Sequence, residues 1–453
     1  MITELSGTLD HSHNKLHIPH TFELPEDATK LSIHFDYSPL IGEGADYSNQ
    51  LSFSLFDPEK SRGTRHNSKE QQAIITDLTA SPGFTPGSLL GGTWTLFVDT
   101  HRIMPPTPVE YQFTIEIETD GVVDETEALL KGSTASRGPG WYRGDLHGHT
   151  LHSDGSWDVA DFITYARENH YDFVTLTDHN TISALAEWDS HCNDKLLTMG
   201  GMELTTYYGH ALALGTRDWW EWRIAFGETM SNLAQQITDA GALFVIAHPR
   251  DQGDPACTGC RWEYEEMMPG VARIVEVWNG SWTKFNEDSL SLAYEWLNAG
   301  HRMAFTYGSD IHGRPSRPKL SHPLNVVYAD DLTEAAILEG VRQGHNYIST
   351  GPVLTLTAIS GEKTYMMGDM VPSNASTAEP VQMNFRWSNC PPGATAKVIR
   401  NGAPAFDCDA NGEGEHRLKA NEDASWYLVE IRDPQGDLLA ITNPLFVKND
   451  LCP

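Results

Sequence analysis

The segment GDLHGHTLHSDG, residues 144–155, carries three histidines and one aspartate within eight positions. Side chains alternate along an extended strand, so His147 and His149 point to the same side and can share one cation. A loop without a chemical role has little reason to carry three imidazoles and a carboxylate. We therefore predict a metal site at this segment, with Asp154 as a further candidate ligand.

The same residue types follow apolar runs further along the chain, in the segments LTDHN, GGMELTTYYGH, VIAHP and YGSDIHG. Their candidate ligands are His179, Glu203, His210, His248, Asp310 and His312. In parallel βα folds the carboxyl ends of the strands share one face, where these side chains would converge. A single histidine is more often a hydrogen-bonded core residue, and a strand-ending aspartate can be a helix cap. Recurrence at five strand ends favours a metal site, and mixed imidazole and carboxylate ligands suit zinc, manganese or iron.

The region that carries these ligands alternates helical spacing with buried, β-rich runs. SWDVADFITYARENH opens with a capping residue, Ser156 or Asp158, and runs into the strand DFVTLTDHN. The same order recurs in ETMSNLAQQITDAGALFVIAHP, FNEDSLSLAYEWLNAGHRMAFTYGSDIH and TEAAILEGVRQGHNYIS. This alternation predicts an α/β domain of parallel βα units, in a barrel or an open sheet.

Strand patterns lie on both sides of that domain. Runs such as NQLSFSLFDP and EYQFTIEIET place apolar residues at every second position, which indicates an N-terminal β-sandwich. PVQMNFRWS and SWYLVEIRDPQGD indicate a second, immunoglobulin-like β-sandwich near the C-terminus. We predict domains at residues 1–135, 136–350 and 351–453.

Together, DLHGHTLHSDG, TDHN, GGMEL, GHALALG, IAHP and GSDIH resemble the motifs of the PHP (polymerase and histidinol phosphatase) superfamily over residues 141–350. The order of parts, the run GHALALGTRDWWEWR and the tail ITNPLFV are most similar to the CehA/McbA-type metallohydrolases. The resemblance implies a distorted (β/α)7 barrel with two or three divalent metals at its C-terminal face.

The resemblance also implies a set of ligands for each metal. The first metal would be held by His147, His149, Glu203 and Asp310. Glu203 would bridge to a second metal, which is completed by His210 and His248. The third would be held by Asp154, His179 and His312. His152 is interpreted as a loop residue, and Asp178 as a residue that orients a ligand.

Paired divalent cations favour hydrolysis, because they make hydroxide available near neutral pH and neutralise charge on the attacked group. The sequence has no GxSxG elbow, no GxGxxG and no Walker loop. The candidate catalytic residues are Glu203, Asp310, His179 and Arg314.

Basic residues near the ligands bear on the substrate. GRPSRPKL carries Arg314, Arg317 and Lys319, which could clamp a phosphate or could be solvated loop charges. The same two interpretations apply to Arg250, after AHP, and to Arg143, before GDLH.

Aromatic residues offer another clue to the substrate. RDWWEWRIAFG, residues 217–227, carries Trp219, Trp220, Trp222 and Phe226. They could wall an apolar pocket for an aryl or alkyl group, or pack against a β-sandwich, which is the favoured interpretation.

Three functions follow from these alternatives. The first is a metal-dependent phosphoesterase acting on a small phosphomonoester or phosphodiester. The second is a carboxylic or carbamate ester hydrolase, the activity for which CehA/McbA-type proteins are named. The third is a non-catalytic binding or scaffold protein with a structural metal site, although such a site needs only four closed ligands.

The net charge of the chain limits the classes of molecule that it can be expected to bind. The net charge of −31 repels nucleic acid and anionic membranes, so we expect a small-molecule ester substrate and no nucleic-acid or membrane partner. The β-domains are candidates for a homo-oligomer interface. We expect no signal peptide at the N-terminus and a cytoplasmic location. CTGC, with Cys257 and Cys260, could be a redox pair or half of a zinc site, but reduced loop cysteines are favoured.

Overall fold

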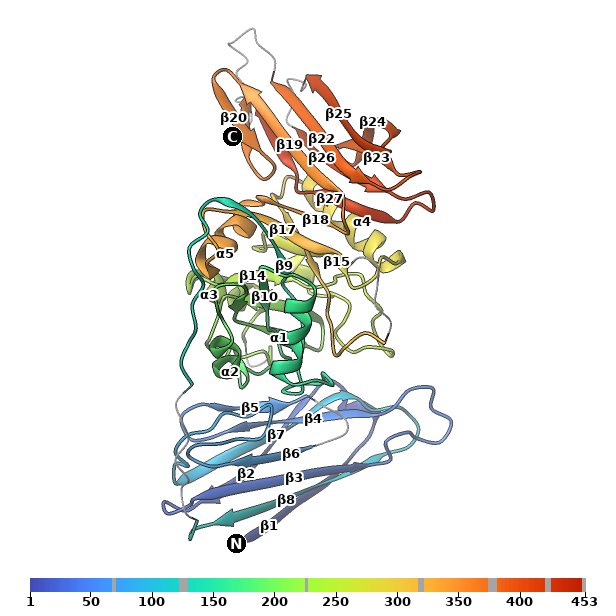
Figure 1. The fold of residues 1–453 in the computed structure, drawn as a ribbon. Helices are drawn as coiled ribbons and strands as arrows, with labels where there is room; N and C mark the ends of the chain where they lie inside the picture. Colours follow the sequence, from blue (N-terminus) through green and yellow to red (C-terminus); the bar gives the residue numbers. More distant parts are fainter. Residues whose placement is uncertain are drawn as a thin grey trace.

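The computed structural model describes residues 1–66, 71–121, 129–224, 227–316, 322–373, 381–419 and 425–449. Figure 1 shows an elongated molecule in which an N-terminal β-domain, a central α/β domain and C-terminal strands follow one another along one axis. In the described part of the chain, no helix has both the length and the apolar character that a membrane crossing requires.

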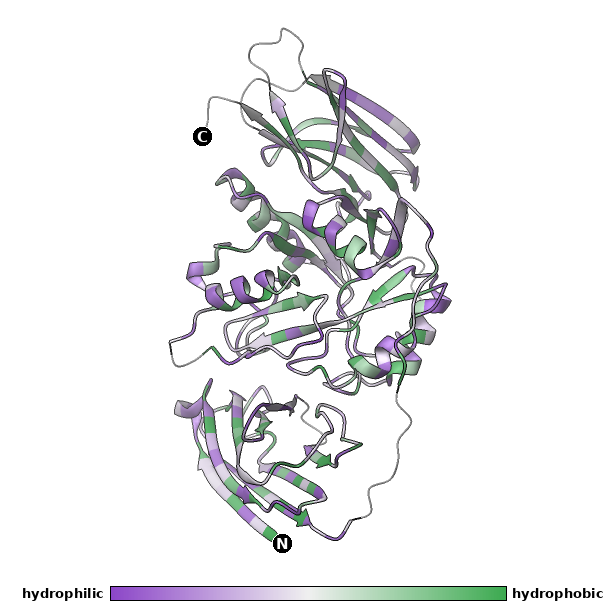
Figure 2. Ribbon diagram, turned by 90° about the vertical axis from the view of Figure 1, so that its left-hand side faces the viewer, coloured by the Kyte–Doolittle hydropathy of each residue, from purple (hydrophilic) through white to green (hydrophobic). Residues whose placement is uncertain are grey.

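The N-terminal β-domain consists of two four-stranded antiparallel sheets. One sheet has the order β1 (Ile2–Leu9), β8 (Val109–Glu118), β3 (Lys30–Ser38) and β6 (Gln72–Ile75). The other has the order β2 (His17–Leu24), β7 (Gly92–Arg102), β4 (Gln50–Phe56) and β5 (Ser61–Arg65). Buried and exposed residues alternate along β8, and Figure 2 shows the matching alternation of hydropathy along these strands. Both sheets contribute side chains to one core, in which the rings of Phe35 and Phe113 stack at 4.4 Å.

The central domain is built on two groups of five strands. One sheet has the order β12 (Gly201–Thr206), β13 (Gly209–Leu214), β14 (Leu243–Ile246), β15 (Ile274–Asn279) and β16 (Ala304–Gly308). The other group runs through β11 (Leu197–Met199), β10 (Phe173–Thr175), β9 (Gly140–Asp145), β17 (Leu324–Ala329) and β18 (Asn346–Ser349). Isolated parallel bridges join the two groups: His179, beyond the end of β10, pairs with Glu203 in β12, and Gly148, beyond β9, pairs with Ile311, beyond β16.

Five α-helices in the described residues accompany these strands. They are α1 (Val159–Glu168), α2 (Leu185–Ser190), α3 (Met230–Asp239), α4 (Lys284–Asn298) and α5 (Glu334–Gln343), with the 3₁₀ turn η2 (Glu265–Met267); a second 3₁₀ turn, η1 (His11–His13), lies in the N-terminal β-domain. Asp158 caps α1, as predicted, by accepting a hydrogen bond from the amide of Asp161. α5 ends at Gly344, whose φ of 71° lies in the left-handed region that glycine tolerates. The expected order of helix then strand is confirmed for α1–β10, α3–β14, α4–β16 and α5–β18.

The pairing of the central strands differs from the expected run of parallel βα units, and the (β/α)7 barrel is not confirmed. β12–β13, β13–β14, β9–β17 and β17–β18 are antiparallel. Only Tyr207 and Tyr208 lie between β12 and β13, and two residues cannot form the crossover that parallel strands need. The domain is therefore mixed α/β, with more strands than helices.

The C-terminal strands form two further layers. One sheet has the order β20 (Lys363–Met366), β19 (Val353–Ser360), β22 (Gln382–Cys390) and β25 (Gly412–Lys419). The other comprises β27 (Leu438–Thr442), β26 (Ser425–Arg432), β23 (Thr395–Arg400), β24 (Ala403–Asp409), β28 (Leu445–Asn449) and β21 (Met370–Ser373). β27 also pairs with β18, so a single sheet runs from the central domain into the C-terminal strands, across the predicted boundary at residue 350.

Candidate metal centre

All nine predicted metal ligands lie together at one end of the central domain, in three groups. The groups are His147, His149, Glu203 and Asp310; Glu203, His210 and His248; and His149, Asp154, His179 and His312. Within each group, one ligand atom from every residue lies within 4.8 Å of the others. Two residues are shared between groups, namely Glu203 and His149, so the three groups form one continuous cluster.

The ends of the strands position these side chains. His147 and His149 follow β9, His248 follows β14 and Asp310 follows β16, whereas Glu203 lies within β12. The chain adopts positive φ at His248 (27°) and at Asp310 (50°), a conformation that residues other than glycine rarely take. Such strain is found at sites where side-chain placement matters for function, because the surrounding structure must hold it in place.

Glu203 is fully buried, and its two carboxylate oxygens face different histidines, with Oε2 also 2.9 Å from Nδ1 of His179. Oε2 lies 3.2 Å from Nε2 of His147 and 3.3 Å from Nε2 of His149. Oε1 lies 3.1 Å from Nδ1 of His210 and 3.3 Å from Nε2 of His248. A carboxylate with imidazoles beside both oxygens has the donor atoms to share between two cations.

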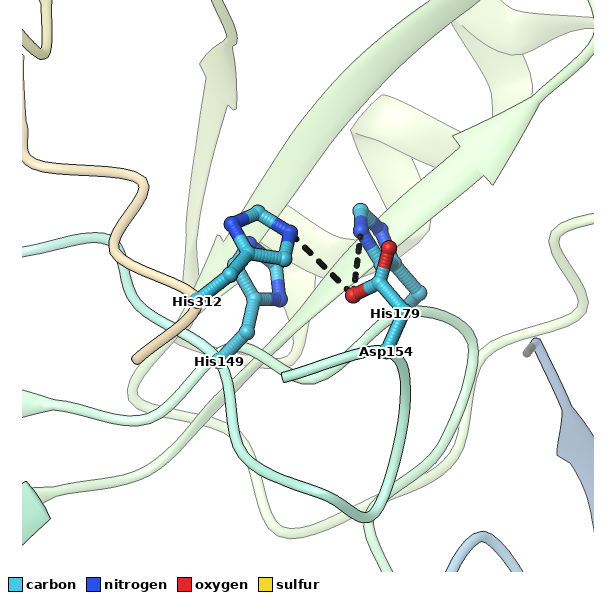
Figure 3. A group of neighbouring side chains, drawn as sticks. All are labelled: His149, Asp154, His179 and His312. Carbon is cyan, nitrogen blue, oxygen red and sulfur yellow. Dashed lines mark ion pairs between the residues drawn. The ribbon is translucent and has the colours of Figure 1, made fainter. Parts of the chain in front are cut away.

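Asp154 is the centre of the third group. Its Oδ1 lies 3.1 Å from Nε2 of His312 and 3.4 Å from Nε2 of His179 (Figure 3). The ring of His149 stacks on both histidines, with ring centroids 4.3 Å from His179 and 4.2 Å from His312. Asp154 and His312 are about one-third exposed, at 35% and 37% of their side chains, so this is the open side of the cluster.

Charge and burial shift the pKa values of the cluster in opposite directions. Burial alone would raise the pKa of Glu203, but His179 and His147 hold the pKa of this carboxyl well below its usual range. Burial alone would lower the pKa of His248 and His312, but Glu203 raises the first pKa to about 9 and Asp154 raises the second to about 10. The metal-free cluster therefore holds protons that a bound cation would displace.

The donors present fit a divalent metal. Two buried ring nitrogens of the cluster, His149 Nδ1 and His210 Nε2, have no hydrogen-bond partner among the described residues. Buried polar groups are ordinarily hydrogen-bonded, so a bound cation is the natural partner for the lone pairs of these atoms. Imidazole and carboxylate donors in this mixture suit zinc, manganese or iron.

Two acidic side chains support His147 and escaped the sequence analysis. Glu276, buried on β15, places Oε2 3.0 Å from Nδ1 of His147. Asn279 donates to Glu276 at 2.7 Å and to Asp310 at 3.3 Å. Asp145 accepts hydrogen bonds from the amides of His147 and Ser309. A lone glutamate inside the apolar strand IVEVWN was the available signal, because an unpaired buried carboxylate is costly.

Asp178 and His152 lie beside the cluster as loop-organising residues. Asp178 accepts hydrogen bonds from the amide and hydroxyl of Thr150, both at 2.7 Å, and from Ser153 at 2.8 Å. It therefore fixes the loop that carries Asp154, in agreement with the orienting role predicted for it. Nδ1 of His152 lies 2.7 Å from the Ser183 hydroxyl.

The basic residues predicted as phosphate contacts lie in varied surroundings. Arg314 pairs with Glu168 of α1 at 2.8 Å, and more than half of its side chain is exposed. Arg143 is exposed on β9, and Arg250 is partly buried beyond β14. Arg317 and Lys319 lie outside the described residues. The catalytic role of Arg314 stays a prediction.

The tryptophan run packs against the N-terminal β-domain. Trp222 is fully buried, with its ring 5.1 Å from that of His17, and Trp219 meets Phe56 edge to face at 5.6 Å. Arg223 lies over the ring of Phe97 at 4.0 Å. These contacts support the packing interpretation over the pocket interpretation. Phe226 lies outside the described residues.

The expectation of reduced cysteines in CTGC was wrong. Cys257 and Cys260 form a disulfide, in a loop that abuts the cluster. The carbonyl oxygen of Cys260 lies 3.0 Å from Nδ1 of His248. The turn brings the two cysteines to a Cα separation of 5.5 Å, which is within bonding range, and spacing alone did not predict this. Disulfides are commoner in oxidising compartments, so the cytoplasmic location stays a prediction.

The N-terminal β-domain also contributes histidines near the cluster. His66 follows β5, and its ring centroid lies 4.8 Å from that of His179 and 4.7 Å from that of His101. Burial, together with His179, lowers the pKa of His66 to about 3. Sequence analysis missed both residues, because no ligand-type pattern surrounds them in RGTRHN or VDTHR.

Among known proteins, solved structures of low sequence identity and low structural similarity match this chain. No family model and no curated protein matches the chain. A two-domain protein from Bacteroides vulgatus, containing a predicted PHP-like metal-dependent phosphoesterase, is 14% identical over 72% of this chain and 100% of its own, with a TM-score of 0.39. An amidohydrolase from Chromobacterium violaceum, with bound sulfate and no metal, is 17% identical over 38% of this chain and 87% of its own, with a TM-score of 0.27. At TM-scores below 0.5, neither likeness assigns an activity, and what the site can do follows from its own residues.

Proposed function

We propose that the protein is a metal-dependent hydrolase that uses a cluster of two or three divalent ions, of manganese, zinc or iron, to activate water. The observation that carries this proposal is the buried Glu203 carboxylate, which presents one oxygen to His147 and His149 and the other to His210 and His248. When bound, such ions supply Lewis acidity and a hydroxide available near neutral pH.

Glu203, His179 and Asp310 would have different roles in such a site. Glu203 would bridge two ions, while His179 contacts both Glu203, at 2.9 Å, and Asp154, at 3.4 Å, and so connects the third group to the bridge. Asp310 lies 2.9 Å from His149 and 3.4 Å from His147. Substrate would approach from the open side, at Asp154 and His312.

For the substrate, we propose a small phosphomonoester or phosphodiester. The motifs that resemble the PHP superfamily support this class, and we propose a distorted PHP barrel of CehA/McbA type as the finer family and fold. The alternative, a carbamate or carboxylic ester, drew its support from an apolar pocket walled by tryptophans. Trp219 and Trp222 pack against the N-terminal β-domain, which weakens that alternative.

A structural metal site in a scaffold protein would need fewer ligands. Such sites are closed by four ligands, whereas this cluster offers nine, with Asp154 and His312 partly open to solvent. An open, shared ligand set is typical of catalytic centres.

The test is to load the purified protein with manganese, zinc or iron, determine its metal content, and assay nitrophenyl phosphate, bis-nitrophenyl phosphate and naphthyl carbamate. We expect hydrolysis of a phosphate ester that a chelator abolishes. Glu203→Gln should lose bound metal together with activity, since it removes the charge of the bridge. Glu295→Gln, exposed on α4, serves as the matched control and should retain both. Full metal occupancy without turnover of any substrate would support the scaffold function instead.

A further inference from the structure

The N-terminal β-domain contacts two loops of the metal centre, the loop before Asp154 and the loop after His179. Arg65 donates from Nη1 to the carbonyls of Leu151, at 2.9 Å, and Ser153, at 3.3 Å, in the residues just before Asp154. Its contact is therefore with the backbone of a loop that bears a ligand.

A second contact of the same domain holds the loop after His179. The amide of Gly83 donates to the Ser183 hydroxyl at 3.1 Å, and its carbonyl accepts from Thr181 at 2.8 Å. A Cβ at Gly83 would lie 2.6 Å from the carbonyl oxygen of Thr64 in its own domain and 3.1 Å from that of His152 across the junction, so this position needs glycine. The β-domain is thus fitted to the cluster, and Figure 1 shows it against that end of the central domain.

His66 follows Arg65 directly and lies at this junction. It is 6% exposed, and its ring lies 4.8 Å from His179 on one side and 4.7 Å from His101 on the other. His101 is held in turn by the Ser52 hydroxyl, 2.8 Å from its Nε2. His66 is thus backed by its own domain and faces the metal centre.

One atom of His66 has no role in the contacts of the described residues. Nδ1 is buried and has no hydrogen-bond partner among them. His66 also belongs to none of the three ligand groups. A buried polar atom without a partner costs free energy, and at the edge of a reactive centre the missing partner is naturally a bound molecule.

We propose that His66 is a substrate-contact residue of the metal centre, whose Nδ1 donates a hydrogen bond to an oxygen of the bound phosphate ester. The proposal rests on the proposed function. The ring of His66 lies 4.8 Å from that of His179, which itself contacts Glu203 at 2.9 Å and Asp154 at 3.4 Å, so His66 lies beside the junction between the Asp154 group and Glu203. The N-terminal β-domain is then part of the active site.

The experiment uses the full-length, metal-loaded protein with His66→Ala and His66→Gln. The matched control is His34→Ala, an exposed histidine on β3 of the same domain that pairs with Asp36. Metal content, binding of inorganic phosphate by calorimetry, and kcat and KM for nitrophenyl phosphate are measured for each. Thermal unfolding identifies a variant that does not fold, in which case the other variant carries the test.

We expect both His66 variants to keep the metal content of the unmodified protein. Loss of one hydrogen bond to a charged ligand should weaken phosphate binding about tenfold and lower kcat/KM by a similar factor. Added imidazole should restore part of the activity of His66→Ala, and His34→Ala should match the unmodified protein. A purely packing role would not respond to imidazole.

Two results would overturn the proposal while leaving the proposed function in place. One is unchanged phosphate binding and kinetics in both His66 variants. The other is loss of metal in step with activity, which would make His66 a metal ligand. If the unmodified, metal-loaded protein neither binds phosphate nor hydrolyses the ester, the proposed function fails, and the assignment of His66 fails with it.

Discussion

Nδ1 of His147 lies 3.0 Å from Oε2 of Glu276, and neither side chain is exposed to solvent. A carboxylate behind a metal-binding imidazole fixes the ring and its tautomer and makes the other nitrogen a better donor. Nε2 of His147 accordingly faces Glu203 and Asp310.

Glu276→Gln should therefore weaken metal binding without unfolding the protein. We expect a loss of about 10- to 100-fold in metal affinity, the usual effect of removing such a partner. Competition with a chelating dye measures it, and Glu295→Gln on α4 is the exposed control. Unchanged affinity in Glu276→Gln would show that the contact is structural only.

The stability of the metal-free protein should fall as the pH rises. The pKa of His248 is raised to about 9 and that of His312 to about 10, against an ordinary value of 6.5. A raised pKa contributes stability that is complete below about pH 6.5 and is lost as the pH passes through the folded-state pKa. We expect the Tm of the chelator-treated protein to decrease between about pH 6.5 and 10.

Metal should reverse this trend, because its binding displaces the same protons and so tightens as the pH rises. The difference in Tm between the metal-loaded and metal-free protein should grow with pH. Thermal scans with and without manganese measure both. A difference that stays constant with pH would exclude protonated histidines from the empty cluster.

Breaking the disulfide should weaken metal binding at His248. The Cys260 carbonyl accepts from Nδ1 of His248, so its loop helps to orient that ring. We expect Cys257→Ser to retain less metal after dialysis than the unmodified protein. Cys408→Ser, a free cysteine on β24, is the control. Equal metal retention in both variants would show that the loop keeps its shape without the bond.

Arg314 tests the choice between phosphate and neutral esters. If its guanidinium turns from Glu168 to a phosphate, Arg314→Ala should raise KM for a phosphate ester several-fold and leave a neutral carbamate nearly unaffected. Glu168→Gln, which frees the guanidinium, should lower KM for the phosphate ester. An equal response of both substrates to Arg314→Ala would rule out a phosphate clamp.

Much of the site could be predicted because its ligands occur in short, local patterns at the ends of strands. Spacing of i, i+2 alone identifies two pairs of candidate ligands, His147 with His149 and Asp310 with His312. The structure brings these pairs together with Glu203, as expected, in one cluster. The helices were equally visible, because apolar spacing and a capping residue such as Asp158 are local features.

What could not be predicted depends on contacts between distant segments. Glu276 appears as an ordinary strand residue until His147, 129 positions away, is placed beside it. His66 lies in a different domain from the metal ligands that it approaches. The antiparallel turn at Tyr207 and Tyr208 lacks the Asn-Gly or Asp-Gly pair that marks a two-residue hairpin, so the repeated helix–strand order favours a parallel arrangement.

The pairing of β18 with β27 has a practical consequence for any attempt to divide the chain into fragments. Truncation after residue 350 would remove β27, with which Tyr347 and Ile348 pair. β18 would then be an exposed edge strand, whose unpaired backbone groups can form hydrogen bonds with another chain. A fragment cut there should aggregate, and the smallest workable fragment that carries the metal-ligand cluster must retain the strand at Leu438–Thr442.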